Sequence, residues 1–171
     1  MVESNGPARM DRITESWARS YPEQDISVLP TMVRTSRLGM LGEAFHRETL
    51  EAFDLQPSDY SVLAALRRQG PDRAISPSEL YYTLERSSGG MTKMLHRLEE
   101  RGLVKRIPDP TDGRTSRVRM TAAGEELERE IFKLSLERSR TLLADLSPSE
   151  IETADTSLKL LLGCLERHFY R

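Results

Sequence analysis

A single segment of this 171-residue chain, residues 103–120, has the pattern of β structure, and the apolar residues elsewhere recur mostly at helical spacing. Residues 103–107 and 117–120 predict two strands, because the second one alternates basic and apolar side chains. The segment between them is dense in Pro, Asp, Gly and Thr, most of which favour turns. One hairpin among helices predicts a mainly α fold with a small β-hairpin.

Start and stop signals divide the rest of the chain into helices. The sequence Ser-Pro-Ser-Glu occurs at Ser76 and again at Ser147, and each copy predicts a helix start with a capping box. Thr121 can cap a further helix, and Gly102 is a typical stop. The predicted helices span residues 10–20, 30–54, 57–69, a short stretch after Ser76, 88–102, 121–145 and 147–170.

The last predicted helix carries more apolar surface than a monomer of this size needs. Its apolar residues are Ile151, Ala154, Leu158, Leu161, Leu162, Leu165 and Phe169. They form a broad stripe, and the helix before it has two apolar faces, which calls for two packing partners. A homodimer built from the helices at both chain ends is the economical explanation.

The charge of the chain is unevenly distributed. The net charge of −2 argues against a nucleic-acid binder, but residues 86–119 carry 9 basic and 4 acidic side chains. The segments on both sides are net acidic. A local basic block of this kind is typical of a polyanion-binding surface, although a solvated basic face would have the same composition.

Several classes of protein are excluded or disfavoured. The single Cys164 rules out a disulfide framework, and its apolar neighbours predict a buried position. His46, His96 and His168 lack metal-ligand spacing, so we expect no metal and no cofactor. Motifs of phosphate-binding loops, dinucleotide folds, metalloproteases and nucleophile elbows are absent, so we predict that the protein is not an enzyme. No signal peptide or membrane span is visible, which predicts a soluble, cytoplasmic protein.

Two short helices followed by a basic hairpin predict a winged helix-turn-helix. The helix over residues 88–101 is slim enough for the major groove of DNA, and helices of this type use their N-terminal residues on base edges. An arginine at a narrow hairpin tip suits the negative potential of a narrow minor groove. The residues predicted to contact DNA are Ser87, Ser88, Gly89, Gly90, Lys93 and Arg97 on the helix, and Asp112, Arg114 and Arg117 on the hairpin.

The motifs in these two elements resemble the MarR family of winged helix-turn-helix regulators. Asp112-Gly113-Arg114, followed by residues 118–121, is similar to the family's wing signature, with Met120 in place of a Leu. Residues 87–104 resemble the family's recognition helix and its run into the wing. The resemblance covers roughly residues 28 to 170. It implies a dimer with two DNA-reading lobes, and usually repression relieved by a small molecule or an oxidant.

An additional N-terminal helix with a lone Trp17 resembles the branch of the family that contains urate-responsive regulators. That branch binds an anionic ligand between the dimer helices and the DNA-reading lobe. Ser61 and Met94 stand where urate-responsive members have an acidic residue and an arginine, which disfavours urate. The candidate ligand residues are Trp17, Arg37, Met40, Tyr60, Met94 and Arg106. For Trp17, a packing anchor that docks the additional helix is favoured over direct contact with a ligand.

We therefore expect residues 1–171 to form a single MarR-like domain. Residues 9–54 and 122–171 would form a helical dimerisation region, and residues 55–121 a winged helix-turn-helix lobe. The expected function is a dimeric, sequence-specific transcriptional regulator, a repressor of a pseudo-palindromic operator that is released by a small anionic or aromatic ligand. The alternative is a winged-helix module that docks proteins and does not bind DNA.

Overall fold

The computed structural model describes residues 6–70, 74–85, 87–110 and 115–170. The chain divides into two compact units, Met1–Pro57 and Ser58–Arg171. Helices dominate both units, and the described strands form one two-stranded antiparallel sheet in the second unit. The mainly α fold with a small hairpin is therefore confirmed.

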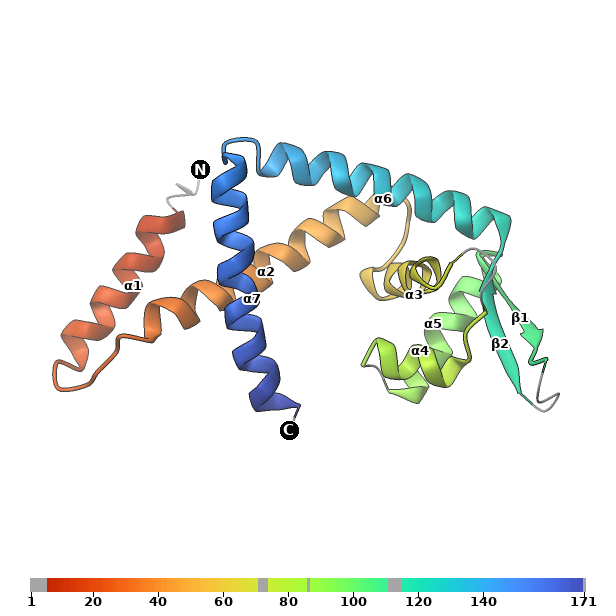
Figure 1. Ribbon diagram of the computed structural model, residues 1–171, viewed down its shortest axis with the longest axis horizontal. Helices are drawn as coiled ribbons and strands as arrows, with labels where there is room; N and C mark the ends of the chain where they lie inside the picture. The colour runs from red at the N-terminus through yellow and green to blue at the C-terminus, as the bar shows by residue number, and fades with distance from the viewer. Residues whose placement is uncertain (1–5, 71–73, 86, 111–114, 171) are drawn as a thin grey trace. The chain divides into compact units, whose positions relative to one another are not determined.

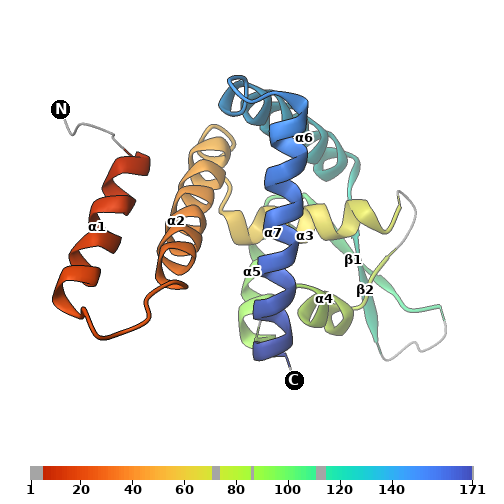
Figure 2. The same ribbon diagram turned by 60° about the vertical axis from the view of Figure 1, so that its left-hand side comes forward.

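The first unit contains two helices that lie side by side (Figures 1 and 2). They are α1 (Gly6–Ser20) and α2 (Leu29–Glu51), and Pro30 occupies the first turn of α2 as its fixed φ predicts. Arg34 of α2 forms an ion pair with Asp11 of α1. Helix α1 begins four residues earlier than the sequence predicts, because the sequence gives no cap there to mark its start.

The second unit carries the remaining elements in the order shown in Figure 1. They are α3 (Pro57–Arg68), α4 (Pro77–Thr83), α5 (Ser88–Glu100), β1 (Val104–Pro108), β2 (Ser116–Met120), α6 (Ala122–Leu142) and α7 (Pro148–Phe169). Within the described residues each predicted element is present, with bounds that differ from the prediction by a few residues at most.

The predicted caps are present and explain where the helices begin. Ser76 and Ser147 each accept a hydrogen bond from the backbone of the glutamate three residues on, and both capping boxes are complete. Thr121 accepts from the Gly124 N–H at the start of α6. Gly102 has φ +67°, a left-handed conformation that ends α5 at little steric cost.

The core of the second unit lies among α3, α4, α5 and the hairpin. Helix α5 buries its Met91, Leu95 and Leu98 side, as the sequence predicts. The other fully buried aliphatic side chains of this core include Val62, Leu63, Leu66, Leu80 and Val118. This core fixes which side of α5 faces outward.

The hairpin pairs Val104 with Met120 and Arg106 with Val118. Val118 and Met120 are buried, so the predicted apolar side of β2 faces the core. A short bridge that the sequence analysis missed extends this sheet: Ile75 and Val118 exchange two backbone hydrogen bonds. The single isoleucine before the Ser76 cap carries no strand pattern of its own, so periodicity could not reveal it.

A close backbone contact holds α6 against the start of the hairpin. A Cβ placed on Gly124 would lie 2.0 Å from the carbonyl oxygen of Leu103. Thr121 also binds this turn, since its hydroxyl donates to the Gly102 carbonyl at 2.6 Å. Only glycine fits at position 124 without moving the backbone.

Helix α7 contrasts with these elements, because no residue along it is buried in the single chain. The prediction that Cys164 is buried is therefore wrong for the chain alone, where this side chain is exposed and its sulfur lies 3.3 Å from Nη2 of Arg167. Periodicity identified an apolar stripe but could not tell whether the same chain covers it.

Candidate nucleic-acid interface

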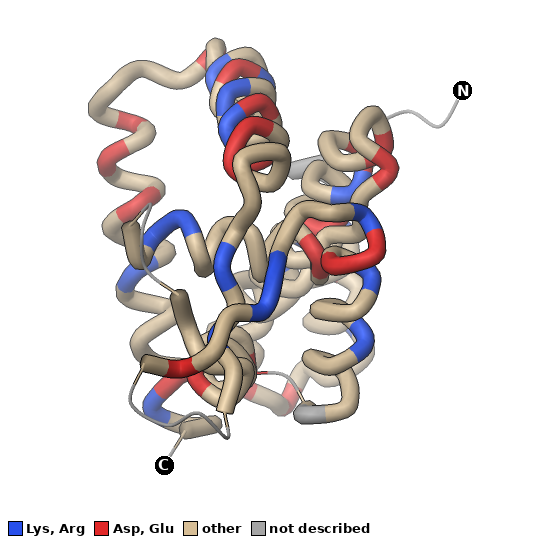
Figure 3. The backbone as a smooth tube through the Cα atoms, turned by 90° about the vertical axis from the view of Figure 1, so that its right-hand side faces the viewer, with Lys and Arg blue, Asp and Glu red and all other residues tan. Residues whose placement is uncertain are grey.

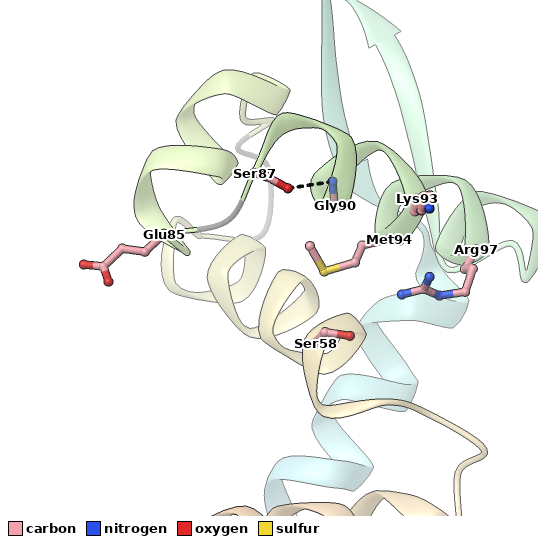
Figure 4. Close-up of a pocket in the computed structure, with 7 residues that line it drawn as sticks. All are labelled: Ser58, Glu85, Ser87, Gly90, Lys93, Met94 and Arg97. Carbon is pink, nitrogen blue, oxygen red and sulfur yellow. Dashed lines mark hydrogen bonds between the residues drawn. The ribbon is translucent and has the colours of Figure 1, made fainter.

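The outward side of α5 begins at a capped helix N-terminus. The Ser87 hydroxyl accepts a hydrogen bond from the Gly90 N–H at 3.1 Å, and Ser88 is the first residue of the helix (Figure 4). A Cβ on Gly89 would meet no atom within 4 Å. Internal packing therefore does not require glycine at position 89, and its bare backbone faces open space.

Lys93 and Arg97 lie one turn apart on the side of α5 that faces away from its core residues. Lys93 is exposed, and within the described residues it forms no ion pair. An open hollow of about 450 Å³ runs beside it (Figure 4). The hollow is lined by Ser58, Glu85, Ser87, Gly90, Lys93, Met94 and Arg97. The structure thus brings four of the predicted DNA-contacting residues together.

Arg97 has an additional role that the sequence analysis missed. Its Nε and Nη2 atoms donate to the two carboxylate oxygens of Asp59, at 3.0 and 2.5 Å. Asp59 is buried in the first turn of α3. The hydrogen bond to Asp59 raises the pKa of Arg97, so this side chain stays fully charged. An acidic residue in a first helical turn is common, and nothing in the sequence links position 59 to position 97.

Arg117 also has partners within the chain. Its Nε donates to Asp109 at 2.5 Å, and its Nη1 donates to the carbonyl of Ala74 at 3.3 Å. The hydrogen bond to Asp109 raises the pKa of Arg117. These bonds connect β2 with the residue that follows β1 and with the segment before α4, so Arg117 stabilises the loop end of the hairpin.

Basic residues follow both strands of the hairpin, at Lys105 and Arg106 on β1 and at Arg117 and Arg119 on β2 (Figure 3). Asp112 and Arg114, the predicted contacts at its tip, lie outside the described residues. These strands account for most of the net positive charge of the central basic block, since the two basic side chains of α5 are offset by Glu99 and Glu100.

The predicted ligand residues of the second unit lie in different places. Met94 is buried beside the hollow at α5, and Arg106 forms an ion pair with Glu99 at 3.1 Å. Tyr60 lines another hollow, of about 520 Å³ between α3 and α6, where burial raises its pKa and Glu128 adds to the effect. In the first unit, Trp17 stacks on Tyr21 with ring centroids 5.5 Å apart, and 46% of Trp17 is exposed.

The remaining predicted ligand residues, Arg37 and Met40, lie on exposed turns of α2 in the first unit. Among the described residues, no group of three or more His, Cys, Asp or Glu side chains could hold a metal ion. A search of the same part of the chain finds no helix with the length and hydropathy needed to cross a membrane.

Helices α4 and α5 joined by a tight turn, followed by a hairpin with basic strands, define a winged helix-turn-helix protein. A family model described as MarR family matches residues 53–115. E. coli K12 "Multiple antibiotic resistance protein MarR" is 30% identical over 116 residues, which are 67% of this chain and 78% of that protein. The chain belongs to the MarR family of transcriptional regulators.

A second relative extends over nearly the whole chain. The "HTH-type transcriptional regulator PecS" of Dickeya dadantii is 29% identical over 156 residues, which are 91% of this chain and 92% of that protein. Among solved structures, a mutant of E. coli MarR complexed with operator DNA aligns with a TM-score of 0.68 and 26% identity, covering 81% of this chain and 99% of that chain. PecS is named as a regulator of transcription, and the MarR structure is described as a complex with operator DNA.

Proposed function

We propose that this protein is a dimeric repressor that binds a pseudo-palindromic operator in the cytoplasm. Residues 55–121 would form the DNA-binding lobe, and residues 9–54 and 122–171 the dimerisation region. The two copies of α5 would enter successive major grooves about 10 bp apart. Direct contacts are assigned to Ser87, Ser88, Gly89, Gly90, Lys93, Arg97, Asp112 and Arg114, while Arg117 would act through the shape of the hairpin.

One observation carries this proposal. Helix α5 buries Met91, Leu95 and Leu98, and this packing turns Lys93 outward at the exposed N-terminal half of the helix. A protein-docking surface would more commonly present an apolar centre. A slim helix with an outward cation and a basic hairpin beside it matches the shape and charge of duplex DNA.

The relatives support the DNA partner, since one of the matching structures holds MarR in complex with operator DNA. The dimer is supported by the exposed stripe of Ile151, Leu158, Leu162 and Phe169 on α7. At 100° per residue these positions fall on one face of the helix. A contiguous apolar face of this kind is typical of an interface.

The test is a fluorescence anisotropy titration with the DNA that flanks the protein's own gene and with a scrambled duplex. We expect preferential binding of the flanking DNA, with a steep decrease in affinity as salt rises. Lys93→Ala should lower the log–log salt slope by about one unit, because one phosphate contact is lost. Lys159→Ala removes the same charge from α7 and should leave the slope unchanged.

Arg114→Ala should weaken operator binding.

Binding of neither duplex at any salt concentration would reject the DNA-binding function and favour the protein-docking alternative. An unchanged salt slope in folded Lys93→Ala would show that Lys93 of α5 does not contact DNA. An unchanged operator affinity in folded Arg114→Ala would remove the hairpin tip.

We also propose that a small anionic or aromatic acid releases the repressor. Candidate contacts are Trp17, Arg37, Met40, Tyr60, Met94 and Arg106. The test is a thermal-shift screen of small carboxylates and aromatic acids, followed by competition against bound operator DNA. A compound that raises the melting temperature and releases DNA supports the proposal, and a screen without one contradicts it.

A further inference from the structure

We propose that Asp59 is a positioning residue for DNA recognition: it orients the Arg97 guanidinium toward the DNA without touching DNA itself. This inference rests on the proposed function. Lys93 and Arg97 are both cations on the outward side of α5, yet among the residues that the structure describes only Arg97 is held by a carboxylate of the same unit. The two residues should therefore contribute to DNA binding in different ways.

The geometry of the ion pair leaves one nitrogen of Arg97 available. Asp59 engages Nε and Nη2 through both of its oxygens. Within the described part of the chain, Nη1 has no hydrogen-bond partner. The guanidinium points into the hollow that Ser58 and Lys93 also line (Figure 4), and 39% of the Arg97 side chain is exposed. A DNA phosphate or base edge that reaches this hollow would meet Nη1.

The burial of Asp59 explains why the pair is persistent. Only 4% of this residue is exposed, and a buried carboxylate is strongly disfavoured without a partner. The planar fork of arginine matches both carboxylate oxygens, which fixes the plane of the guanidinium as well as its position. An arginine that is already ordered loses little side-chain freedom on binding, so it binds more tightly to a duplex whose groups fit its fixed position.

Long-range electrostatics predicts the opposite effect of removing Asp59. A carboxylate near DNA repels the phosphates, so Asp59→Asn should strengthen binding to every duplex if charge alone mattered. If Asp59 positions Arg97, the same substitution should weaken binding to the operator, because Arg97 loses its orientation. The sign of the change therefore separates the two explanations.

The experiment uses the full-length dimer and an operator that the wild-type protein has selected from random duplexes. Anisotropy titrations compare that operator with a scrambled duplex. We expect Asp59→Asn to lower operator affinity about 10-fold, the size of a lost charge-assisted hydrogen bond, and to leave the scrambled duplex bound equally or more tightly. Glu100→Gln is the matched control, since it removes one negative charge from α5 itself and should cause no loss.

Two further variants test that the effect passes through Arg97. In an Arg97→Ala background, Asp59→Asn should cause no additional loss, because the orienting carboxylate then has nothing to orient. Asp59→Glu keeps the charge but displaces the carboxylate by one methylene. It should fold and still lower operator affinity, which a purely electrostatic role would not produce.

The inference is overturned if Asp59→Asn folds and binds the operator at least as tightly as the wild type. A variant with a lower melting temperature but unchanged operator affinity is one such case. It is equally overturned if the losses from Asp59→Asn and Arg97→Ala add. If Asp59→Asn fails to fold, Asp59→Glu decides, and wild-type operator affinity in that variant overturns the inference. A wild-type protein that selects no duplex at all contradicts the proposed function itself.

Discussion

The winged-helix lobe, formed by α3, α4, α5 and the hairpin, and helix α7 use the same local signals and end in opposite states of burial. Helix α4 in the lobe and helix α7 each begin at a Ser-Pro-Ser-Glu sequence with a complete capping box. In the lobe, Leu63, Leu80 and Leu98 are fully inaccessible to solvent. In α7, Leu158 is 49% exposed and no residue is buried.

This difference shows that burial is a property of packing partners and not of the helix itself. The lobe contains three helices and a hairpin whose apolar sides face one another, so one chain completes its core. Helix α7 presents an apolar stripe of similar composition. The described residues of the same chain leave much of this stripe exposed. A second chain is the simplest source of the missing surface.

The largest expected effect tests that interpretation of α7. Leu158→Glu places a charge in the centre of the stripe, and we expect it to raise the dimer dissociation constant by about 100-fold or more, because the charge would be buried without a partner. Operator affinity should fall by a similar factor, since two linked lobes bind far more tightly than one. Sedimentation velocity and anisotropy measure both.

Leu160→Glu is the control for this prediction. Leu160 lies half a helical turn away from the stripe and is also exposed. It should leave the dimer intact. A Leu158→Glu protein that remains dimeric at nanomolar concentration would show that α7 does not need a second chain.

A smaller effect is expected from removing matched leucines. Leu98→Ala should lower the free energy of unfolding by about 2–5 kcal/mol, because it leaves a cavity in a closed core. Leu162 lies on the exposed stripe of α7, so Leu162→Ala should mainly weaken dimerisation. Denaturation at several protein concentrations distinguishes them: the Leu162→Ala defect should shrink as the concentration rises. Equal, concentration-independent losses would contradict the comparison.

Two helical glycines sharpen the comparison further. Gly124→Ala should lower stability by about 1–3 kcal/mol, because its Cβ would meet the Leu103 carbonyl where α6 packs against the start of the hairpin. Gly163→Ala in α7 should stabilise its helix by up to about 1 kcal/mol, since its nearest neighbour is the flexible end of Arg167. Thermal denaturation checks both. Destabilisation by Gly163→Ala at low protein concentration would mean that α7 is tightly packed in the single chain.

The smallest expected effect is the one that should be equal in both regions. Ser76→Ala and Ser147→Ala each remove the hydroxyl that accepts the capping hydrogen bond, at 3.1 Å in α4 and 3.3 Å in α7. Each should cost about 1 kcal/mol of stability, because a capping bond depends on the helix terminus and not on the core. Chemical denaturation measures this. A loss at one site several times that at the other would show that one cap also makes tertiary contacts.

Sequence patterns were sufficient for the elements and for part of the site. Cap residues and apolar spacing identified each helix and the hairpin, because these signals act within a few residues of one another. The outward side of α5, with Lys93, followed from the same spacing. The Ile75 bridge and the close approach at Gly124 were missed, since each depends on a contact with residues far away in the sequence.

The sequence by itself determined which segments are helical, where they begin and end, and which of their sides are apolar. Tertiary structure decided which of those apolar sides are covered, and it decided the partners of the arginines. Arg97 and Arg117 look alike as outward cations in the sequence, yet folding brings Asp59 to the first and Asp109 to the second. The physical reason is distance: helix periodicity is a local property, whereas an ion pair between residues 59 and 97 exists only after the chain has folded.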